Sequence, residues 1–518
     1  MNAGADNVNF PRAVRLWRIL NILGRHNFQR RLIRRRLIFF SLGSLVIIAW
    51  QMTNFSLRSE LSTDYKNSAA VALTSEHKFL YFLYYENLFP IATTEENLDF
   101  SREGARELLQ TRGDSLQTEL DSTIRWGDLG QTYLYLPYAI MKGSPEHFDL
   151  RPTCGALFIL SLLFVFGTFL LHHRPLTGCC LVVLFGSNPF QLYEAYAHNN
   201  VFSLNISLFL FLLALNFSLL VTKTRLRTML IKCLASSVLI AIFVQFRSDL
   251  KTLILVVGLC IIFCRGASRL QRAGGLIVLV LAYSMTIYAL QGYFNQKIED
   301  AKSVVKLHGG HIYEGPIQHS HSVWHPLVLG LADVDKDFHF DDRFGHHVVM
   351  DLLERDSGVK LPEYSDTEWG FVDYYHDEAK RFRVEPPQLP GYNEWMKGIF
   401  INFVFDNPFK YFKGLTLRIG RVIKNVTPAG LAIGSFSLSS KLVWLLSIPV
   451  LLIVAVQRQW PQVVLMLSTL ALSATALMIY SGRGLTYYGC MHLVATALVV
   501  SWIMDYRTLK RRSKAWSN

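Results

Sequence analysis

The stretch Leu37–Met52, LIFFSLGSLVIIAWQM, decides the fold class, because it carries no charged residue and directly follows the basic run Arg25–Arg36, RHNFQRRLIRRR. An apolar run with arginines at one end is typical of a membrane-spanning helix whose basic end stays in the cytoplasm. The stretch before it has neither the short n-region nor the small-residue cleavage site of a secretory signal peptide. We therefore interpret it as the cytoplasmic anchor of an uncleaved first helix.

The whole chain has the composition of a membrane protein. It has 518 residues, of which 51% are hydrophobic and 18% are charged, against about 25% charged in soluble proteins. Since a backbone in hydrocarbon must satisfy its own hydrogen bonds, the apolar runs should be helices. We predict an all-α polytopic membrane protein with about ten transmembrane helices and irregular, α-rich extracytoplasmic segments. The predicted spans are Leu37–Met52, Cys154–Leu171, Leu176–Ser187, Val201–Thr222, Cys233–Phe246, Leu250–Cys264, Gly275–Leu290, Lys441–Val456, Val463–Tyr480 and Met491–Met504.

The connectors between these spans predict the orientation. Those assigned to the cytoplasm are basic and contain no Asp or Glu, as the positive-inside rule requires: His172–Pro175, Lys223–Lys232, Arg265–Arg272, Gln457–Gln462 and the tail stretch Arg507–Lys514. Both termini are then cytoplasmic. The predicted parts are a basic N-terminus (1–36), a transmembrane module (37–290) with a first outer loop (53–153), a large extracytoplasmic loop (291–398), an interfacial amphipathic segment (399–440), C-terminal transmembrane helices (441–504) and a basic tail (505–518). The segment 399–440 could equally be a simple connector on the lipid headgroups.

Composition also excludes several functions. The net charge of +13 comes from Lys and Arg beside the apolar runs, so it indicates orientation and contact with membrane lipids, and we expect no nucleic-acid partner. The seven cysteines lie in or beside apolar runs and predict no disulfide framework. A large outer loop without cysteine favours a bacterial inner membrane. No P-loop, GxSxG or HExxH motif is present, which argues against ATP-driven transport by this chain.

Acidic residues near the outer helix ends are the candidate catalytic groups. Asp64 follows the first span, and Asp128 lies in a Gly-Asp-x-Gly turn before the second. Glu60 and Tyr65, beside Asp64, are candidate substrate-binding residues. A partly desolvated carboxylate at the interface can act as a general base or a metal ligand. The alternatives are an ordinary solvated loop and a turn before an aromatic belt.

Further candidates lie in the later outer loops. Glu194 and His198 are four residues apart, so on a helix they share one face. They could hold a sugar or, with Asp128, a divalent cation such as Mg²⁺ or Mn²⁺, although plain interfacial residues would look the same. The histidine-rich run of the large loop, HSHSVWHP, could bind a sugar through His321, Trp324 and His325. Its histidines, with the Asp residues that follow, could instead bind zinc or manganese.

A lipid phosphate at the outer face would need one or two cations. The candidates lie near outer helix ends: Arg58, Arg247 and Arg483. The alternative is snorkelling of these side chains to the headgroups.

Four of these segments together resemble the GT-C class of polytopic glycosyltransferases, which use polyprenyl-phosphate-linked sugars. They are Arg58–Ala70, Gly127–Gly143, Asn188–Phe202 and Phe246–Gly258. The resemblance implies transfer of a sugar from a polyprenyl-phosphate donor to an envelope glycan or lipid acceptor on the non-cytoplasmic face. It makes Asp64 the catalytic acidic residue, with Asp128 or Glu194 as a second acidic partner. The chain departs from the class at Asn199 and Asn200, where an acid is usual, and in placing its large loop before the last three spans.

Two other functions compete with this one. An O-antigen-type polymerase or ligase would use Arg and His in the leading roles, and the His-rich loop favours it. A non-enzymatic flippase or scaffold would not depend on the outer carboxylates.

Overall fold

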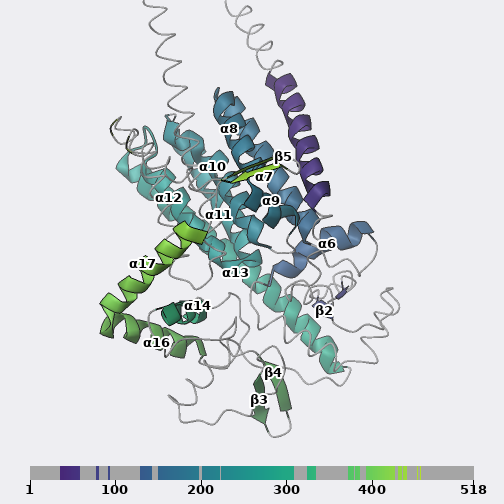
Figure 1. Ribbon diagram of the computed structural model, residues 1–518, viewed down its shortest axis with the longest axis vertical. Helices are drawn as coiled ribbons and strands as arrows, with labels where there is room; N and C mark the ends of the chain where they lie inside the picture. Colours follow the sequence, from purple (N-terminus) through teal and green to yellow (C-terminus); the bar gives the residue numbers. More distant parts are fainter. Residues whose placement is uncertain are drawn as a thin grey trace, which may run out of the picture.

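The computed structural model describes residues 36–58, 78–80, 91–93, 129–142, 150–197, 201–221, 223–307, 324–333, 372–377, 380–384, 392–425, 430–433 and 436–439, together with residues 452 and 456. A bundle of helices forms its main body (Figure 1). The bundle contains the helix Arg36–Arg58 (the first helix), α6 (Gln131–Lys142), α7 (Arg151–Leu171), α8 (Pro175–Gly186), α9 (Pro189–Tyr196), η2 (Val201–Ser203), α10 (Leu204–Val221), α11 (Leu226–Phe246), η3 (Ser248–Leu253), α12 (Ile254–Ile262) and α13 (Arg269–Leu307).

Among the described residues, four helices are long and apolar enough to cross a membrane: Arg36–Arg58, Arg151–Leu171, Leu226–Phe246 and Arg269–Ser303. Shorter apolar helices occupy Pro175–Gly186, Leu204–Leu220 and Leu250–Ile262. These helices coincide with the first seven predicted spans and make the chain a helical membrane protein. The last three predicted spans lie outside the described residues, apart from residues 452 and 456, so the total of ten stays a prediction.

Small residues let the first helix approach α7 closely. A Cβ atom added at Gly43 would lie 2.5 Å from the ring of Phe166, and one added at Gly167 would lie 2.8 Å from the ring of Phe40. Helices in membranes associate through such close packing, since lipid gives no hydrophobic drive between them. The two glycines therefore fix the first helix against α7.

The basic connectors gather at one end of the bundle. The Arg36 guanidinium lies 2.9 Å from Nε2 of His173, which adopts a left-handed backbone (φ 58°) in the tight turn between α7 and α8. At the same end, the backbone N–H of Thr224 donates to the carbonyl of Arg265, and Arg272 donates to the carbonyl of Cys264. The opposite end carries α6, α9 and η3, so the chain alternates between the two ends as the connector charges predict.

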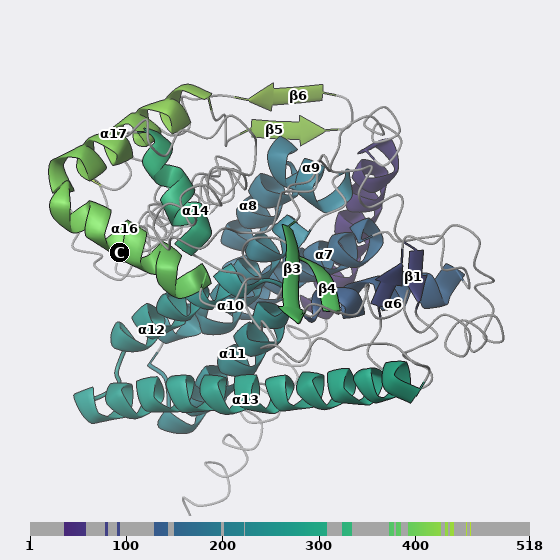
Figure 2. The same ribbon diagram turned by 90° about the horizontal axis from the view of Figure 1, so that it is seen from below.

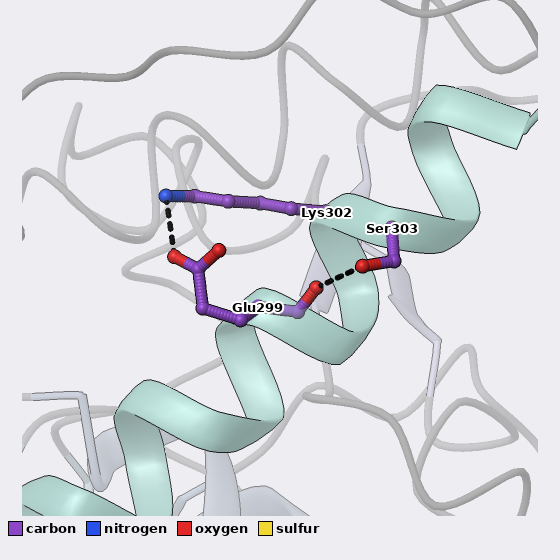
Figure 3. Close-up of polar contacts among 3 residues, drawn as sticks. All are labelled: Glu299, Lys302 and Ser303. Atoms are coloured by element: carbon purple, nitrogen blue, oxygen red, sulfur yellow. Dashed lines mark hydrogen bonds and ion pairs between the residues drawn. The ribbon is translucent and has the colours of Figure 1, made fainter.

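Helix α13 is longer than its predicted span of Gly275–Leu290. Its 39 residues extend about 58 Å at 1.5 Å per residue, roughly twice the thickness of the hydrocarbon layer. Figure 2 shows it crossing below α10–α12 and continuing toward α6. In this extension Lys302 pairs with Glu299 at 2.8 Å, and the Ser303 hydroxyl donates to the Glu299 carbonyl (Figure 3). The helix therefore continues to Leu307, beyond the predicted span, because hydropathy detects the apolar part of a helix and not its polar continuation.

The outer segments contain strands as well as helices. Short helices occupy α14 (Trp324–Leu329), η4 (Gly330–Asp333), α16 (Tyr392–Asp406) and α17 (Pro408–Asn425). Three antiparallel hairpins pair β1 (Lys78–Leu80) with β2 (Ile91–Thr93), β3 (Val372–Asp377) with β4 (Lys380–Val384), and β5 (Gly430–Ile433) with β6 (Phe436–Ser439). The all-α prediction holds for the bundle but missed these hairpins in the outer segments.

Candidate functional site

The first helix and the second outer loop meet in a buried hydrogen-bond network. The Tyr196 hydroxyl donates to the Gln51 side-chain carbonyl at 2.8 Å, and the Gln51 amide donates to the Gly186 carbonyl at 3.0 Å. Both side chains are fully buried, and burial raises the pKa of the Tyr196 phenol above its ordinary value. The phenol therefore stays protonated and donates this hydrogen bond. The bond holds α9 against the first helix about two turns before Arg58.

Glu194 lies in α9 and is only 2% exposed. Asn188 begins this helix by accepting the Gln191 backbone N–H on its side-chain oxygen at 3.1 Å, as an N-cap residue does. The helix ends at Tyr196, before His198. His198 lies outside the described residues, so the face that it was predicted to share with Glu194 stays a prediction.

Gly130, the last residue of the Gly-Asp-x-Gly motif, lies against the end of α11 that contains Gln245. The Gly130 N–H donates to the Gln245 carbonyl at 2.9 Å, and a Cβ on Gly130 would lie 2.8 Å from that carbonyl oxygen. Only glycine allows this approach without a shift. Because Arg247 follows Gln245 by two residues, the backbone brings Gly130 beside the segment that contains Arg247.

Helices α6 and α7 link the Gln51–Tyr196 network to the contact between Gly130 and Gln245. The N-terminal part of α7 contacts Tyr196, since a Cβ on Gly155 would lie 3.0 Å from its ring. Helix α6 packs against α7 and α11, and its Tyr133 ring lies 5.5 Å from the ring of Phe294 on α13. At the end of the bundle opposite the basic connectors, the first helix, α6, α7, α9, α11 and α13 therefore form one region. We call it the outer-end region, because the connector charges predict that it lies outside.

Cations border this region. Arg58 and Arg247 are both half-buried. The extension of α13 adds two buried lysines that the sequence did not single out: Lys297, whose ammonium lies 5.8 Å from the Tyr293 ring centroid, and Lys302. They were missed because the predicted span ended at residue 290. The spacing of Glu299 and Lys302, an acid and a base three residues apart, is the signal in the sequence that could have indicated a helical extension.

Several predicted site residues lie outside the described part of the chain: Glu60, Asp64, Tyr65, Asp128, His198, His321 and Arg483. Trp324 and His325 begin α14. The Trp324 ring packs 6.2 Å from Phe400, and the Lys397 ammonium lies 5.8 Å from its centroid. Within the described residues, no group of three or more His, Cys, Asp or Glu side chains could hold a metal ion.

Comparison with known proteins gives one structural similarity. The fold is similar to that of the archaeal oligosaccharyltransferase AglB from Archaeoglobus fulgidus, solved in complex with an inhibitory peptide and a dolichol-phosphate, with a TM-score of 0.40 and 10% sequence identity. The match covers 91% of this chain and 51% of AglB, so the chain spans about half the length of that protein. This TM-score is too low to assign a fold family. No protein-family model and no curated protein sequence matches the chain.

Replacing Tyr196 with Phe tests the network at the outer end. The change should lower the stability of the detergent-solubilised protein by about 1–3 kcal/mol, because the buried Gln51 carbonyl loses its donor. Thermal unfolding of the purified protein measures the effect. Tyr288→Phe is the matched control, since Tyr288 is 81% exposed on α13. Equal unfolding temperatures for the two variants would contradict the network.

Proposed function

We propose that the protein is a membrane glycosyltransferase that moves a sugar from a polyprenyl-phosphate donor to a glycan or lipid acceptor on the non-cytoplasmic face. One observation carries the proposal. The segments that resemble the GT-C class lie far apart in sequence, yet two of them contact a helix that leads directly into another of them, at one end of the bundle. Tyr196 and Gly186 contact Gln51 of the first helix, and Gly130 contacts Gln245.

The chemistry suits that end of the molecule. A lipid-linked donor keeps its phosphate at the bilayer surface, where a carboxylate just beyond a helix end can reach the acceptor hydroxyl. Asp64 is the proposed general base, with Asp128 or Glu194 as its acidic partner. The departing phosphate gains negative charge and needs a fixed cation. Arg58, Arg247 and Arg483 are proposed for that role, and His321, Trp324 and His325 for contacts with the sugar.

A divalent cation is part of the proposal. A carboxylate and an imidazole, as in Asp128 and His198, are donors that suit Mn²⁺, and a carboxylate with water suits Mg²⁺. When bound, the ion would supply additional positive charge for the departing phosphate. Asp64, in contrast, acts on the acceptor and not on the phosphate.

The experiment is transfer by the purified protein in lipid nanodiscs. Polyprenyl-phosphate sugars with a radiolabelled sugar are supplied together with candidate glycan and lipid acceptors. The proposal predicts labelled acceptor together with release of polyprenyl phosphate. A donor that crosses the bilayer of a vesicle but is never cleaved would instead indicate a flippase.

A further inference from the structure

Helix α17 has one covered face and one open face. Tyr411 and Gly414 are buried, and the Tyr411 ring packs edge-on against Phe400 of α16 at 5.6 Å. Phe400 in turn packs on Trp324 of α14. Helices α14, α16 and α17 therefore form a small unit. Among the described side chains of α17, those on the side of Tyr411 pack into the core of this unit.

The open face of α17 carries large apolar side chains. Phe409 is 87% exposed, Phe412 is 63% exposed and Leu417 is 46% exposed, and Phe405 at the end of α16 is 80% exposed. Positions 409, 412 and 416 are three and four residues apart, a spacing that places residues on one side of an α-helix. Phe409 and Phe412 therefore lie on the same side of α17. Exposed aromatic side chains gathered in one place mark a surface that contacts another apolar phase.

The same helix is strongly basic. Between Pro408 and Asn425 it contains no Asp or Glu and five cations: Lys410, Lys413, Arg418, Arg421 and Lys424. Lys410 and Lys413 are exposed and adjoin the two phenylalanines in sequence. Aromatic side chains beside lysines on one amphipathic helix match a helix that lies in the plane of an anionic membrane surface. A protein partner would have to supply both an apolar groove and a matching acidic rim.

The position of α17 in the molecule also favours contact with a membrane surface. In Figure 1 the helix lies to the left of the bundle and α6 to the right, both toward the end opposite the first turn of the first helix. That end is where the apolar helices leave the predicted hydrocarbon layer. A basic helix there is within reach of the headgroups.

We propose that α17 binds the surface of a bilayer that contains anionic phospholipid. Phe409 and Phe412 enter between the headgroups, and Lys410 and Lys413 face the lipid phosphates. This inference does not depend on glycosyl transfer.

Photo-crosslinking in nanodiscs tests the proposal. The full chain carries p-benzoylphenylalanine at residue 409, and it is irradiated in phosphatidylcholine nanodiscs with or without about one-third phosphatidylglycerol. Mass spectrometry then detects phospholipid attached to the protein. We expect a lipid adduct at 409 that is roughly ten-fold stronger with phosphatidylglycerol. The same probe at Met285, which is 72% exposed on the apolar part of α13, should give an adduct in both lipids.

Charge variants complete the test. Lys410→Gln with Lys413→Gln should remove the preference for phosphatidylglycerol at residue 409. Lys223→Gln with Arg227→Gln removes the same charge from exposed positions at the opposite end and should leave the preference unchanged. Size-exclusion chromatography confirms that each variant is folded. The proposal is overturned by a Met285 adduct without a 409 adduct, by equal 409 yields in the two lipids, or by attachment of residue 409 to a second protein copy.

Discussion

Replacing Asp64 with Asn should lower the kcat of sugar transfer by roughly 10²- to 10⁴-fold. An amide keeps nearly the size of the carboxylate but cannot accept the proton of the acceptor hydroxyl. Because the donor is held through its phosphate and lipid, KM for the donor should change little. The measurement is the initial rate of label transfer in nanodiscs at saturating donor.

Two further variants make the Asp64 result specific. Asp300→Asn makes the same chemical change on the outer extension of α13, and it should retain the wild-type rate. Changing His319, His321 and His325 together to Ala separates the two enzyme hypotheses. If the histidine variant lost all transfer while Asp64→Asn kept the full rate, the polymerase or ligase reading would replace the GT-C-like one.

Replacing Gly130 with Ala should damage both folding and activity. The added methyl carbon would lie 2.8 Å from the Cβ and from the backbone carbonyl oxygen of Gln245, and backbone atoms cannot rotate away as a side chain can. We expect a loss of about 1–3 kcal/mol in stability. Since a shift of about 1 Å can cost about 10²-fold in rate, displacement of the turn that holds Asp128 should also lower transfer sharply.

Gly292→Ala is the control for this prediction. A Cβ on Gly292 would meet nothing within 4 Å, and alanine is favoured over glycine inside a helix by about 1 kcal/mol. This variant should therefore be at least as stable as the wild type and fully active. Normal unfolding temperature and transfer rate for Gly130→Ala would show that the contact with Gln245 is not needed.

Much of the bundle was predictable from the sequence because spanning helices depend on a simple property, their apolar length. The first seven apolar runs coincide with apolar helices, and the basic connectors lie together at one end. Apolar length did not predict that α13 continues to Leu307. Polar residues such as Lys297 and Glu299 resemble a loop by hydropathy, but Phe294, Ile298 and Ala301 keep helical spacing and are buried along one side.

The candidate site was predictable only as a set of separate segments. Nothing in the composition of the Gly-Asp-x-Gly turn indicates that Gly130 meets Gln245, because that contact depends on how α6 packs on α11. Nothing in the sequence around Tyr196 indicates that its hydroxyl is a buried donor to Gln51. The hairpin β3–β4 was missed because the sequence of the large loop is only weakly periodic.

The sidedness of the candidate residues is the measurement that tests the central claim most directly. Single cysteines are placed at Asp64, Asp128, His321, Lys223 and Arg265 in a background without native cysteines, and sealed right-side-out vesicles are treated with a membrane-impermeant maleimide. Cysteines at residues 64, 128 and 321 should react at once, and those at 223 and 265 only after the membrane is permeabilised. Labelling of positions 64 and 321 from opposite sides would contradict a shared outer site.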